Sequence, residues 1–402
     1  MTSRARSLAA TGMEGDRVRV RVLATCGCFE PGFRGGGPVR SLAAIMASLP
    51  GHVDLLLVTR DRDLGSAQPY PGLSGRWVDR YRSRIFYLDT RRPGQWLRLW
   101  RALRRDEYDL LYVNSLWAPV FTVVPVLAAR LRLIRAATVL IAPRGELSAG
   151  ALSLKAGKKR LFLRWWRPFL RGMDTVWHAS TRHEATDIRS AFPWASVEIN
   201  QDQSQLPAEP MPATEPEAGP ARLVFISRIS PKKNLELALR ALPLVGGRID
   251  FDIYGPREDA AYWARCEALI ALLPPTVRVR YRGELAPAAV PGTFHAYDAF
   301  VFPTLGENFG HAIAESLSAS CPVICSDTTP WTDVLDKGGG QVVRDLTVDG
   351  LAAALRSVVS MSPDARLRAR LAAGEAYRRW QAQSIKINIF EQVLCSSRAV
   401  GR

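Results

Sequence analysis

A proline-rich break near the middle of the chain separates two runs of alternating strand-like and helix-like segments. The break, residues 201–221 ("QDQSQLPAEPMPATEPEAGPA"), holds five prolines and few apolar residues, which is the composition of a linker. On both sides of it, short apolar runs such as "VDLLLVT" (53–59) and "AFVFPT" (299–304) alternate with helical patterns such as "NLELALRAL" (234–242). This alternation is typical of a parallel sheet covered by helices on both faces. The sequence therefore predicts two doubly wound α/β domains.

The length of 402 residues also favours two cores, because one core rarely serves so long a chain. Two such domains that face each other across a cleft bind ligands at the carboxyl ends of their strands. We expect a flexible tail at 1–16 (with Met13 as a second candidate start), a first Rossmann-like domain at 17–200, a linker at 201–221, a second Rossmann-like domain at 222–375 and a helical C-terminal segment at 376–402.

Composition indicates which partners the protein could bind and which cell compartment it could occupy. The net charge of +16 fits nucleic acid, an anionic membrane surface or a phosphorylated substrate, or else an arginine-rich proteome in which Arg replaces Lys on solvated faces. No run of about 18 apolar residues predicts a membrane-spanning helix, and the first residues lack the apolar core of a signal peptide. Six scattered cysteines, with Cys26 and Cys28 wrongly spaced for a zinc knuckle, predict a reduced cytoplasmic compartment.

Two stretches at expected strand ends offer phosphate-binding features. Gly36 and Gly37 in "GGGPVRS" lie between the first strand and a helix, where free amides and the helix dipole attract an anion. A plain tight turn is the alternative. In "FISRISPKKNLE", Arg228 follows a strand and Lys233 stands at the mouth of the next helix. Because the dipole disfavours cations there, the pair predicts a diphosphate site rather than two solvated side chains.

A third stretch, "PTLGENFGHAIAESLSAS" (303–320), places two glutamates around the start of a helix. Glu307 lies in the loop at the carboxyl end of a strand, and Glu315 lies just over one turn into the helix. A carboxylate in such a place accepts hydrogen bonds from the vicinal hydroxyls of a sugar or ribose. The alternative is that both acids only complement the helix dipole. Because Arg228 and Lys233 stand at the start of the same domain, ligand binding by the two glutamates is the preferred interpretation.

Glu-x7-Glu after a strand, preceded by Arg-x4-Lys at the start of the same domain, resembles the family 4 retaining glycosyltransferases of the GT-B fold. The resemblance covers nearly the whole chain through "GGPVRS", "NSLWAP", "APRGELSAGALSLKAGKKRLFL", "WHASTRHEATDI", "SRISPKKNLELALRAL", "PTLGENFGHAIAESL" and "SDTTPW". These motifs look like a bacterial branch that assembles surface polysaccharides. The resemblance implies a metal-independent hexosyltransferase that uses a nucleotide-diphosphate sugar and a glycan acceptor, predicted to be lipid-linked.

The same resemblance implies roles for individual positions. Gly36 and Gly37 would approach the donor phosphates, Arg228 and Lys233 would grip the diphosphate, and Glu307 would be the catalytic carboxylate that contacts the donor sugar. The remaining donor-binding positions are Asn308, Phe309 and Gly310, through their backbone amides, and Glu315, which would hold the ribose. No cofactor or metal is expected, and the "DFD" at 250–252 is interpreted as part of a buried strand.

The acceptor side departs from the family pattern. Asn114 stands where many members carry a histidine, so the resemblance favours a donor phosphate oxygen as the proton acceptor. Arg144 and Glu146 in "PRGELS" follow another strand and point to the same cleft, with Arg144 either binding an acceptor phosphate or bracing Glu146. Asn234 replaces the common glycine after Lys233. We interpret His178 and His183 as ordinary polar contacts.

The segment 155–171, "KAGKKRLFLRWWRPFLR", contains no acidic residue. On a helix its four aromatic side chains, Phe162, Trp165, Trp166 and Phe169, share one apolar sector. Such a helix either rests on an anionic membrane or packs its aromatics on the sheet, and both interpretations stay open. The first predicts peripheral attachment to the cytoplasmic face of the inner membrane.

Two other functions are alternatives to glycosyl transfer. An epimerase or glycoside phosphorylase on the same scaffold requires other cleft acids, histidines or phosphate-binding residues, which the motifs above lack. A basic nucleic-acid-binding protein requires basic and aromatic residues interleaved along a stripe, and leaves Glu307 and Glu315 without a role. We therefore expect no nucleic acid partner.

Overall fold

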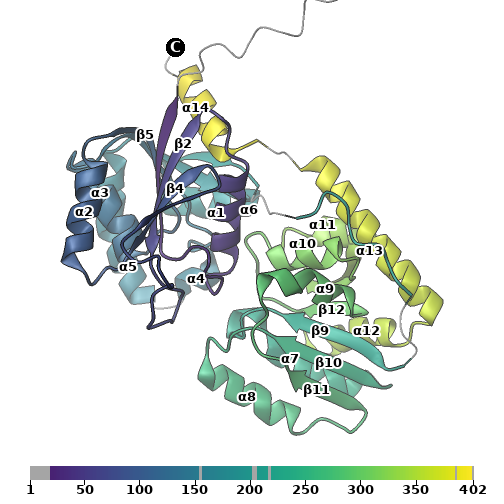
Figure 1. The fold of residues 1–402 in the computed structure, drawn as a ribbon. Helices are drawn as coiled ribbons and strands as arrows, with labels where there is room; N and C mark the ends of the chain where they lie inside the picture. The colour runs from purple at the N-terminus through teal and green to yellow at the C-terminus, as the bar shows by residue number, and fades with distance from the viewer. Residues whose placement is uncertain (1–18, 154–155, 202–205, 216–218, 385–386, 401–402) are drawn as a thin grey trace, which may run out of the picture.

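A computed structural model describes residues 19–153, 156–201, 206–215, 219–384 and 387–400, and the expected tail at 1–16 lies outside this part of the chain. The described residues form two α/β domains (Figure 1). The first contains an eight-stranded sheet in the order β3-β4-β2-β1-β5-β6-β7-β8, and the second a six-stranded sheet in the order β11-β10-β9-β12-β13-β14. The predicted fold class, two doubly wound domains with a helical C-terminal segment, is confirmed.

In the first sheet every neighbouring pair is parallel except β3–β4. The inner strands are continuous apolar runs because helices cover both faces. One face packs under α1 (Gly37–Ala47), and the other packs under α2, α3, α5 and α6. The strands are β1 (Val20–Cys26), β2 (Val53–Arg60), β3 (Trp77–Arg80), β4 (Ser83–Leu88), β5 (Glu107–Val113), β6 (Arg135–Ile141), β7 (Thr175–Ala179) and β8 (Ser196–Ile199), and the helices on the second face are α2 (Pro93–Leu103), α3 (Val124–Arg130), α5 (Ala156–Arg171) and α6 (Arg182–Ala191).

The edge strand β3 was not expected from the sequence. It pairs antiparallel with β4 through a two-residue turn at Tyr81 and Arg82, with φ of 52° and 55°. Such hairpin turns need positive φ at both central residues and usually carry Asn-Gly. A tyrosine and an arginine in these positions give no turn signal, which is why the hairpin escaped prediction.

Helix α5 turns its aromatic residues in two directions. Trp166 is buried with Leu163 and Leu170, and Phe162 and Phe169 pack against the same core. Trp165 instead is 72% exposed. The expectation that all four aromatics share one sector was therefore wrong for Trp165, because adjacent residues on a helix point about 100° apart.

The second sheet is parallel throughout and has the strand order of a dinucleotide-binding fold. Its strands supply the largest buried cluster of the molecule, together with the helices that cover them. The strands are β9 (Ala221–Ile226), β10 (Ile249–Tyr254), β11 (Val277–Tyr281), β12 (Ala299–Phe302), β13 (Val323–Ser326) and β14 (Gly340–Val343), and the helices include α7 (Leu235–Ala241), α8 (Ala260–Ile270), α9 (Val290–His295), α10 (His311–Ser318), α11 (Thr332–Val334) and α12 (Val348–Val359).

The two acids of "DFD" lie on β10 opposite arginines of β11. Asp250 and Asp252 face Arg278 and Arg280 in the parallel register. Asp252 is buried and accepts hydrogen bonds from Arg280 Nε at 2.7 Å, Arg282 Nε at 3.2 Å and the Tyr297 hydroxyl at 2.7 Å. Hydrogen bonding by Arg278 lowers the pKa of Asp250. Both carboxylates therefore hold strands together.

The C-terminal segment returns to the first domain. Helix α13 (Pro363–Gln383) lies along the second domain, and the expected boundary at 375 falls inside it; α14 (Ile389–Val400) lies on the first domain (Figure 1). Ile389, Phe390 and Val393 are buried in the core beneath α1. Asn388 Nδ2 donates to Ile45 O at 2.9 Å at the end of α1. The first domain is thus built from two separate stretches of chain.

The ligand-binding end of each sheet follows from the strand order. In the second sheet, the strand order reverses between β9 and β12, and open α/β sheets bind ligands at the carboxyl ends of the strands beside such a point. Arg228 follows β9, and Glu307 follows β12. Within the described residues, no helix has both the length and the apolar character needed to cross a bilayer.

Candidate active site between the two domains

Lys233 and Glu307 form an ion pair at the switch point of the second sheet. The two side chains are only 10% and 12% exposed. The Lys233 ammonium lies 5.2 Å from the centre of the Phe302 ring, and the Thr304 hydroxyl donates to Glu307 Oε1 at 2.9 Å. A cation and a carboxylate are therefore held together at the mouth of a helix. Their predicted roles, toward a diphosphate and its sugar, stay predictions.

Arg228 and Asn234 complete this side of the cleft. Arg228 Nη1 donates to Glu258 Oε1 at 2.8 Å, and its side chain is 41% exposed. Asn234 has φ of 57°, so it takes the left-handed conformation for which a glycine is common. Asn234 thus adopts the backbone conformation that a glycine would adopt at this position.

Helix α10 points its amino end into the cleft. Gly310 is its N-cap, with φ of 87°, and the first turn carries no acidic side chain. Phe309 is buried between Trp331 and Trp380, and Trp331 Nε1 donates to its carbonyl oxygen. The start of α10 is thereby fixed on the packed core, and a helix start held in this way suits an anionic ligand.

Helix α1 of the first domain begins opposite α10. Gly36 is its N-cap, with φ of 66°, and a β-carbon on Gly36 would lie 4.0 Å from Arg228 Nε. A β-carbon on Gly37 would lie 3.1 Å from the His311 ring. The two glycines therefore allow the domains to approach closely, and two helix amino ends face the same space.

Charged side chains bridge the cleft. Arg40 on α1 pairs with Glu315 on α10, and Arg34 Nε donates to Glu284 Oε2 at 3.0 Å. The Ser41 hydroxyl and His311 Nε2 lie 3.0 Å apart. Arg40, Ser41 and His311 were not among the predicted site residues. Arg40 and Ser41 lie within the quoted "GGPVRS" motif, which was the available signal.

Arg144 and Asn114 lie together on the first-domain side. Arg144 Nε donates to Asn114 Oδ1 at 2.7 Å, and its Nη2 donates to the Tyr112 hydroxyl. Arg144 has φ of 56°, and a β-carbon on the next residue, Gly145, would lie 3.1 Å from Asn308. The loop after β6 therefore reaches the loop after β12 across the cleft.

Two carboxylates, the half-buried Glu146 and the buried Glu184, hold this loop in place. Glu146 accepts hydrogen bonds from Leu116 N at 2.6 Å and the Ser115 hydroxyl at 2.9 Å, and its burial raises its pKa. Glu184, which the sequence did not single out, accepts from Gly145 N at 2.6 Å and from Ser180 N at 2.8 Å. Glu146 thus positions a neighbouring loop, and Arg144 and Asn114 remain the polar groups suited to an acceptor.

The predicted site residues lie in the loops after the strands of both sheets or in the helices that follow these loops, on the side where the two domains meet, and their roles stay predictions. His178 lies elsewhere, buried with its Nε2 3.0 Å from Asn200 O, next to the crossing between the domains. The described residues contain no group of three His, Cys, Asp or Glu side chains that could hold a metal ion. That the reaction requires no metal stays a prediction.

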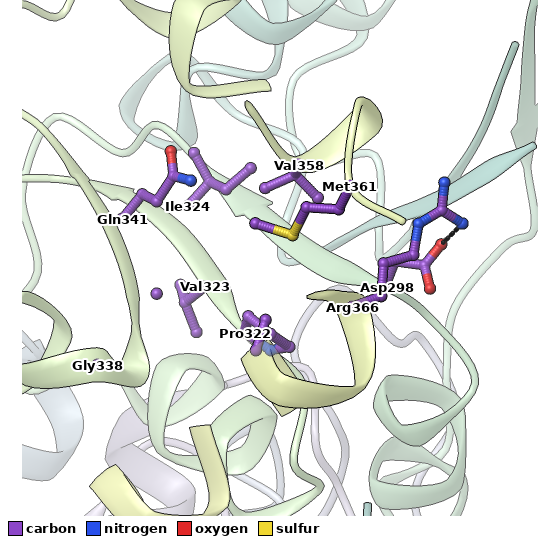
Figure 2. Close-up of a pocket in the computed structure, with 11 residues that line it drawn as sticks. Asp298, Pro322, Val323, Ile324, Gly338, Gln341, Val358, Met361 and Arg366 are labelled. Atoms are coloured by element: carbon purple, nitrogen blue, oxygen red, sulfur yellow. Dashed lines mark hydrogen bonds and ion pairs between the residues drawn. The ribbon is translucent and has the colours of Figure 1, made fainter. Parts of the chain in front are cut away.

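A small pocket in the second domain lies away from this cleft. Its lining includes Ile324, Gln341, Val358 and Met361, and the ion pair between Asp298 and Arg366 stands at one side (Figure 2). Asp298 precedes β12, whereas Glu307 follows it. The pocket is therefore at the opposite edge of the sheet from the predicted site.

Comparison with known proteins supports the glycosyltransferase resemblance for the second domain. Residues 209–377 match the family model described as "Glycosyl transferases group 1". Glycogen synthase of Mycobacterium tuberculosis is 30% identical over 173 residues, which are 40% of this chain and 40% of that protein. The O-antigen chain mannosyltransferase B of Escherichia coli is 28% identical over 122 residues, 29% of this chain and 31% of that protein. The chain thus spans well under half the length of these relatives.

Solved structures extend the likeness to the whole chain at the level of the fold. HepE of Anabaena, solved in complex with UDP and glucose, has a TM-score of 0.69 at 16% identity and covers 95% of this chain and 100% of its own. Sucrose-phosphate synthase of Thermosynechococcus elongatus has a TM-score of 0.70 at 15% identity and covers 94% of this chain and 100% of its own. The protein therefore has the GT-B fold.

Proposed function

We propose that this protein is a retaining glycosyltransferase of family 4 that moves a hexosyl unit from a nucleotide-diphosphate sugar to a hydroxyl of a glycan acceptor. The observation that carries the proposal is the buried pair of Lys233 and Glu307 beside Arg228, with the amino ends of α1 and α10 aimed at the same space. Cations and helix amino ends suit a diphosphate, and carboxylates suit sugar hydroxyls. The group 1 match of residues 209–377 includes all three residues and Glu315.

The proposed reaction needs stabilisation of a leaving diphosphate. The acceptor hydroxyl oxygen forms a bond to the anomeric carbon on the face from which the diphosphate departs, and the bond between that carbon and the phosphate oxygen breaks. The hydroxyl proton passes to the departing phosphate oxygen. Lys233 and Arg228 offset the developing negative charge, and no metal is required in this proposal. Glu307 orients the donor sugar, and Glu315 holds the ribose once Arg40 is displaced.

The acceptor is proposed to be a lipid-linked glycan in surface-polysaccharide assembly on the cytoplasmic side of the inner membrane. The O-antigen mannosyltransferase among the relatives supports this choice. Arg144 and Asn114, on the first-domain side of the cleft, are the proposed acceptor contacts.

The first test is binding of nucleotides without metal. We expect UDP or UDP-glucose, chosen because HepE was solved with them, to raise the melting temperature of the protein in EDTA, since a ligand that binds only the folded state stabilises it. GDP and ADP series would identify the base. A protein stabilised by duplex DNA and by no nucleotide would contradict the proposal.

Replacing Glu315 by glutamine should weaken nucleotide binding. The carboxylate would lose a charge-assisted hydrogen bond to the ribose, so we expect the dissociation constant to rise about 10- to 100-fold. Isothermal titration calorimetry measures it. Glu267→Gln on the exposed face of α8 is the matched control, with wild-type affinity expected. Equal affinity of both variants would exclude Glu315 from the donor site.

A further inference from the structure

The outward face of α5 combines large apolar side chains with cations. Trp165 is 72% exposed and Leu161 is 60% exposed, although the opposite face of the same helix is buried in the core. Pro168 is exposed on the same side. Exposed tryptophan and leucine in one patch are unusual for a surface that only faces water.

The charges around these side chains are all positive. Lys158, Arg160 and Arg164 are exposed on α5, and no acidic residue occurs between 155 and 173. Within the part of the chain that the structure describes, no ion pair engages these three cations. The outward face of α5 is therefore basic as well as apolar, and the helix itself carries no carboxylate.

The turn after α3, near the end of α5, carries two more exposed leucines. Leu131 is 66% exposed and Leu133 is 51% exposed, and Arg132 between them has φ of 56°. The turn is ordered, because Leu131 N donates to Leu127 O at 2.9 Å and Leu133 N donates to Ala128 O at 2.8 Å. A β-carbon on Gly172, just beyond α5, would lie 3.2 Å from Arg130 Nη2, which joins the two elements.

We propose that the outward face of α5 and the turn at 130–133, together called the α5 face, dock on an anionic lipid bilayer. Apolar side chains flanked by cations match the acyl boundary and the anionic headgroups of such a surface. A nucleic acid would also attract the cations, but leucines are poor partners for bases and phosphates. The α5 face therefore fits lipid better than a polyanion.

The position of α5 connects the α5 face to the cleft. Lys159 Nζ donates to Ala151 O in α4 (Ala149–Ser153), which follows the loop of Arg144. The other end of α5 lies near Arg130. A helix of 16 residues spans about 24 Å, so docking would lay this side of the first domain on the bilayer with the acceptor loop close by. Binding to the bilayer does not depend on the proposed function. Only the orientation of the acceptor loop toward the bilayer rests on it.

The test is co-sedimentation of the full chain with two kinds of vesicle. Neutral vesicles contain phosphatidylcholine alone, and mixed vesicles contain phosphatidylcholine and the anionic lipid phosphatidylglycerol. We expect binding to the mixed vesicles, weakened at high salt, and at least a tenfold weaker partition for Leu161→Ser/Trp165→Ser. Arg160→Gln/Arg164→Gln should weaken binding and reduce its salt dependence. Leu272→Ser, at an 81% exposed position of the second domain, is the control with wild-type binding.

Unchanged melting temperatures would show that the variants are folded, as their exposure predicts. Absence of binding to the mixed vesicles, equal binding of the α5 variants, or equal binding to neutral vesicles would each overturn the proposal. Retention on duplex DNA without vesicle binding would overturn it in favour of a polyanion site. The sedimentation assay contains no nucleotide and no acceptor, so its outcomes are independent of the proposed activity. The nucleotide titrations test that activity separately.

Discussion

Replacing Lys233 by methionine is expected to lower kcat by about 10²- to 10³-fold, which is the usual cost of removing one group that stabilises charge in a transition state. The ammonium is buried beside Glu307 and is the cation best placed to meet a leaving diphosphate. Methionine keeps the apolar length that packs on Phe302 but removes the charge. The release of nucleotide diphosphate from the donor sugar and an acceptor measures the effect.

Two controls separate chemistry from folding in this experiment. Lys337→Met, at an exposed position of the second domain, should keep the wild-type kcat. The melting temperature of Lys233→Met without ligand reports whether the unpaired Glu307 destabilises the domain, as breaking a buried pair often does. A folded Lys233→Met protein with normal turnover would remove Lys233 from the mechanism.

The largest stability effect is expected for Asp252→Asn, which should reduce the free energy of unfolding of the second domain by about 2–4 kcal/mol. The carboxylate is 3% exposed and joins Arg280, Arg282 and Tyr297 around the edge of the sheet. An amide keeps the shape but removes the counter-charge of Arg282 and leaves Arg280 with only Asp250, 3.8 Å away. Thermal unfolding and urea denaturation followed by circular dichroism measure the change.

Asp250→Asn is the matched control on the same strand. Its partner Arg278 is 61% exposed, so we expect a loss below about 1 kcal/mol, as for other surface ion pairs. Similar losses for both variants would mean that burial does not decide the strength of these pairs. Neither variant should change nucleotide affinity, because both residues lie within β10 rather than in the cleft.

The fold was predictable because its determinants are local. Buried parallel strands such as β12 and β13 are short apolar runs, and a run of this kind can be recognised without knowing its neighbours. Arg228 and Glu307 were placed in the cleft for the same reason, since each directly follows such a strand and parallel strands end at one edge.

The contacts across the cleft were not predictable from these patterns. The pair of Arg40 and Glu315 and the approach of Gly145 to Asn308 depend on how two domains face each other. The periodicity of apolar residues within one segment does not indicate how two domains are oriented. Trp165 shows a further limit, because composition identifies an apolar helix but does not show which of two adjacent tryptophans faces the core.

The return of the chain to the first domain has a consequence for its biogenesis. Residues 20–199 leave the ribosome first, but Ile389 and Phe390, which fill the space beneath α1, are made only after the whole second domain. A nascent first domain therefore waits with an open apolar surface, which is the kind of surface that chaperones bind. The time needed to synthesise the second domain decides how long this surface stays exposed. Slow translation of that domain should therefore lower the yield of folded protein and leave the stability of the folded protein unchanged.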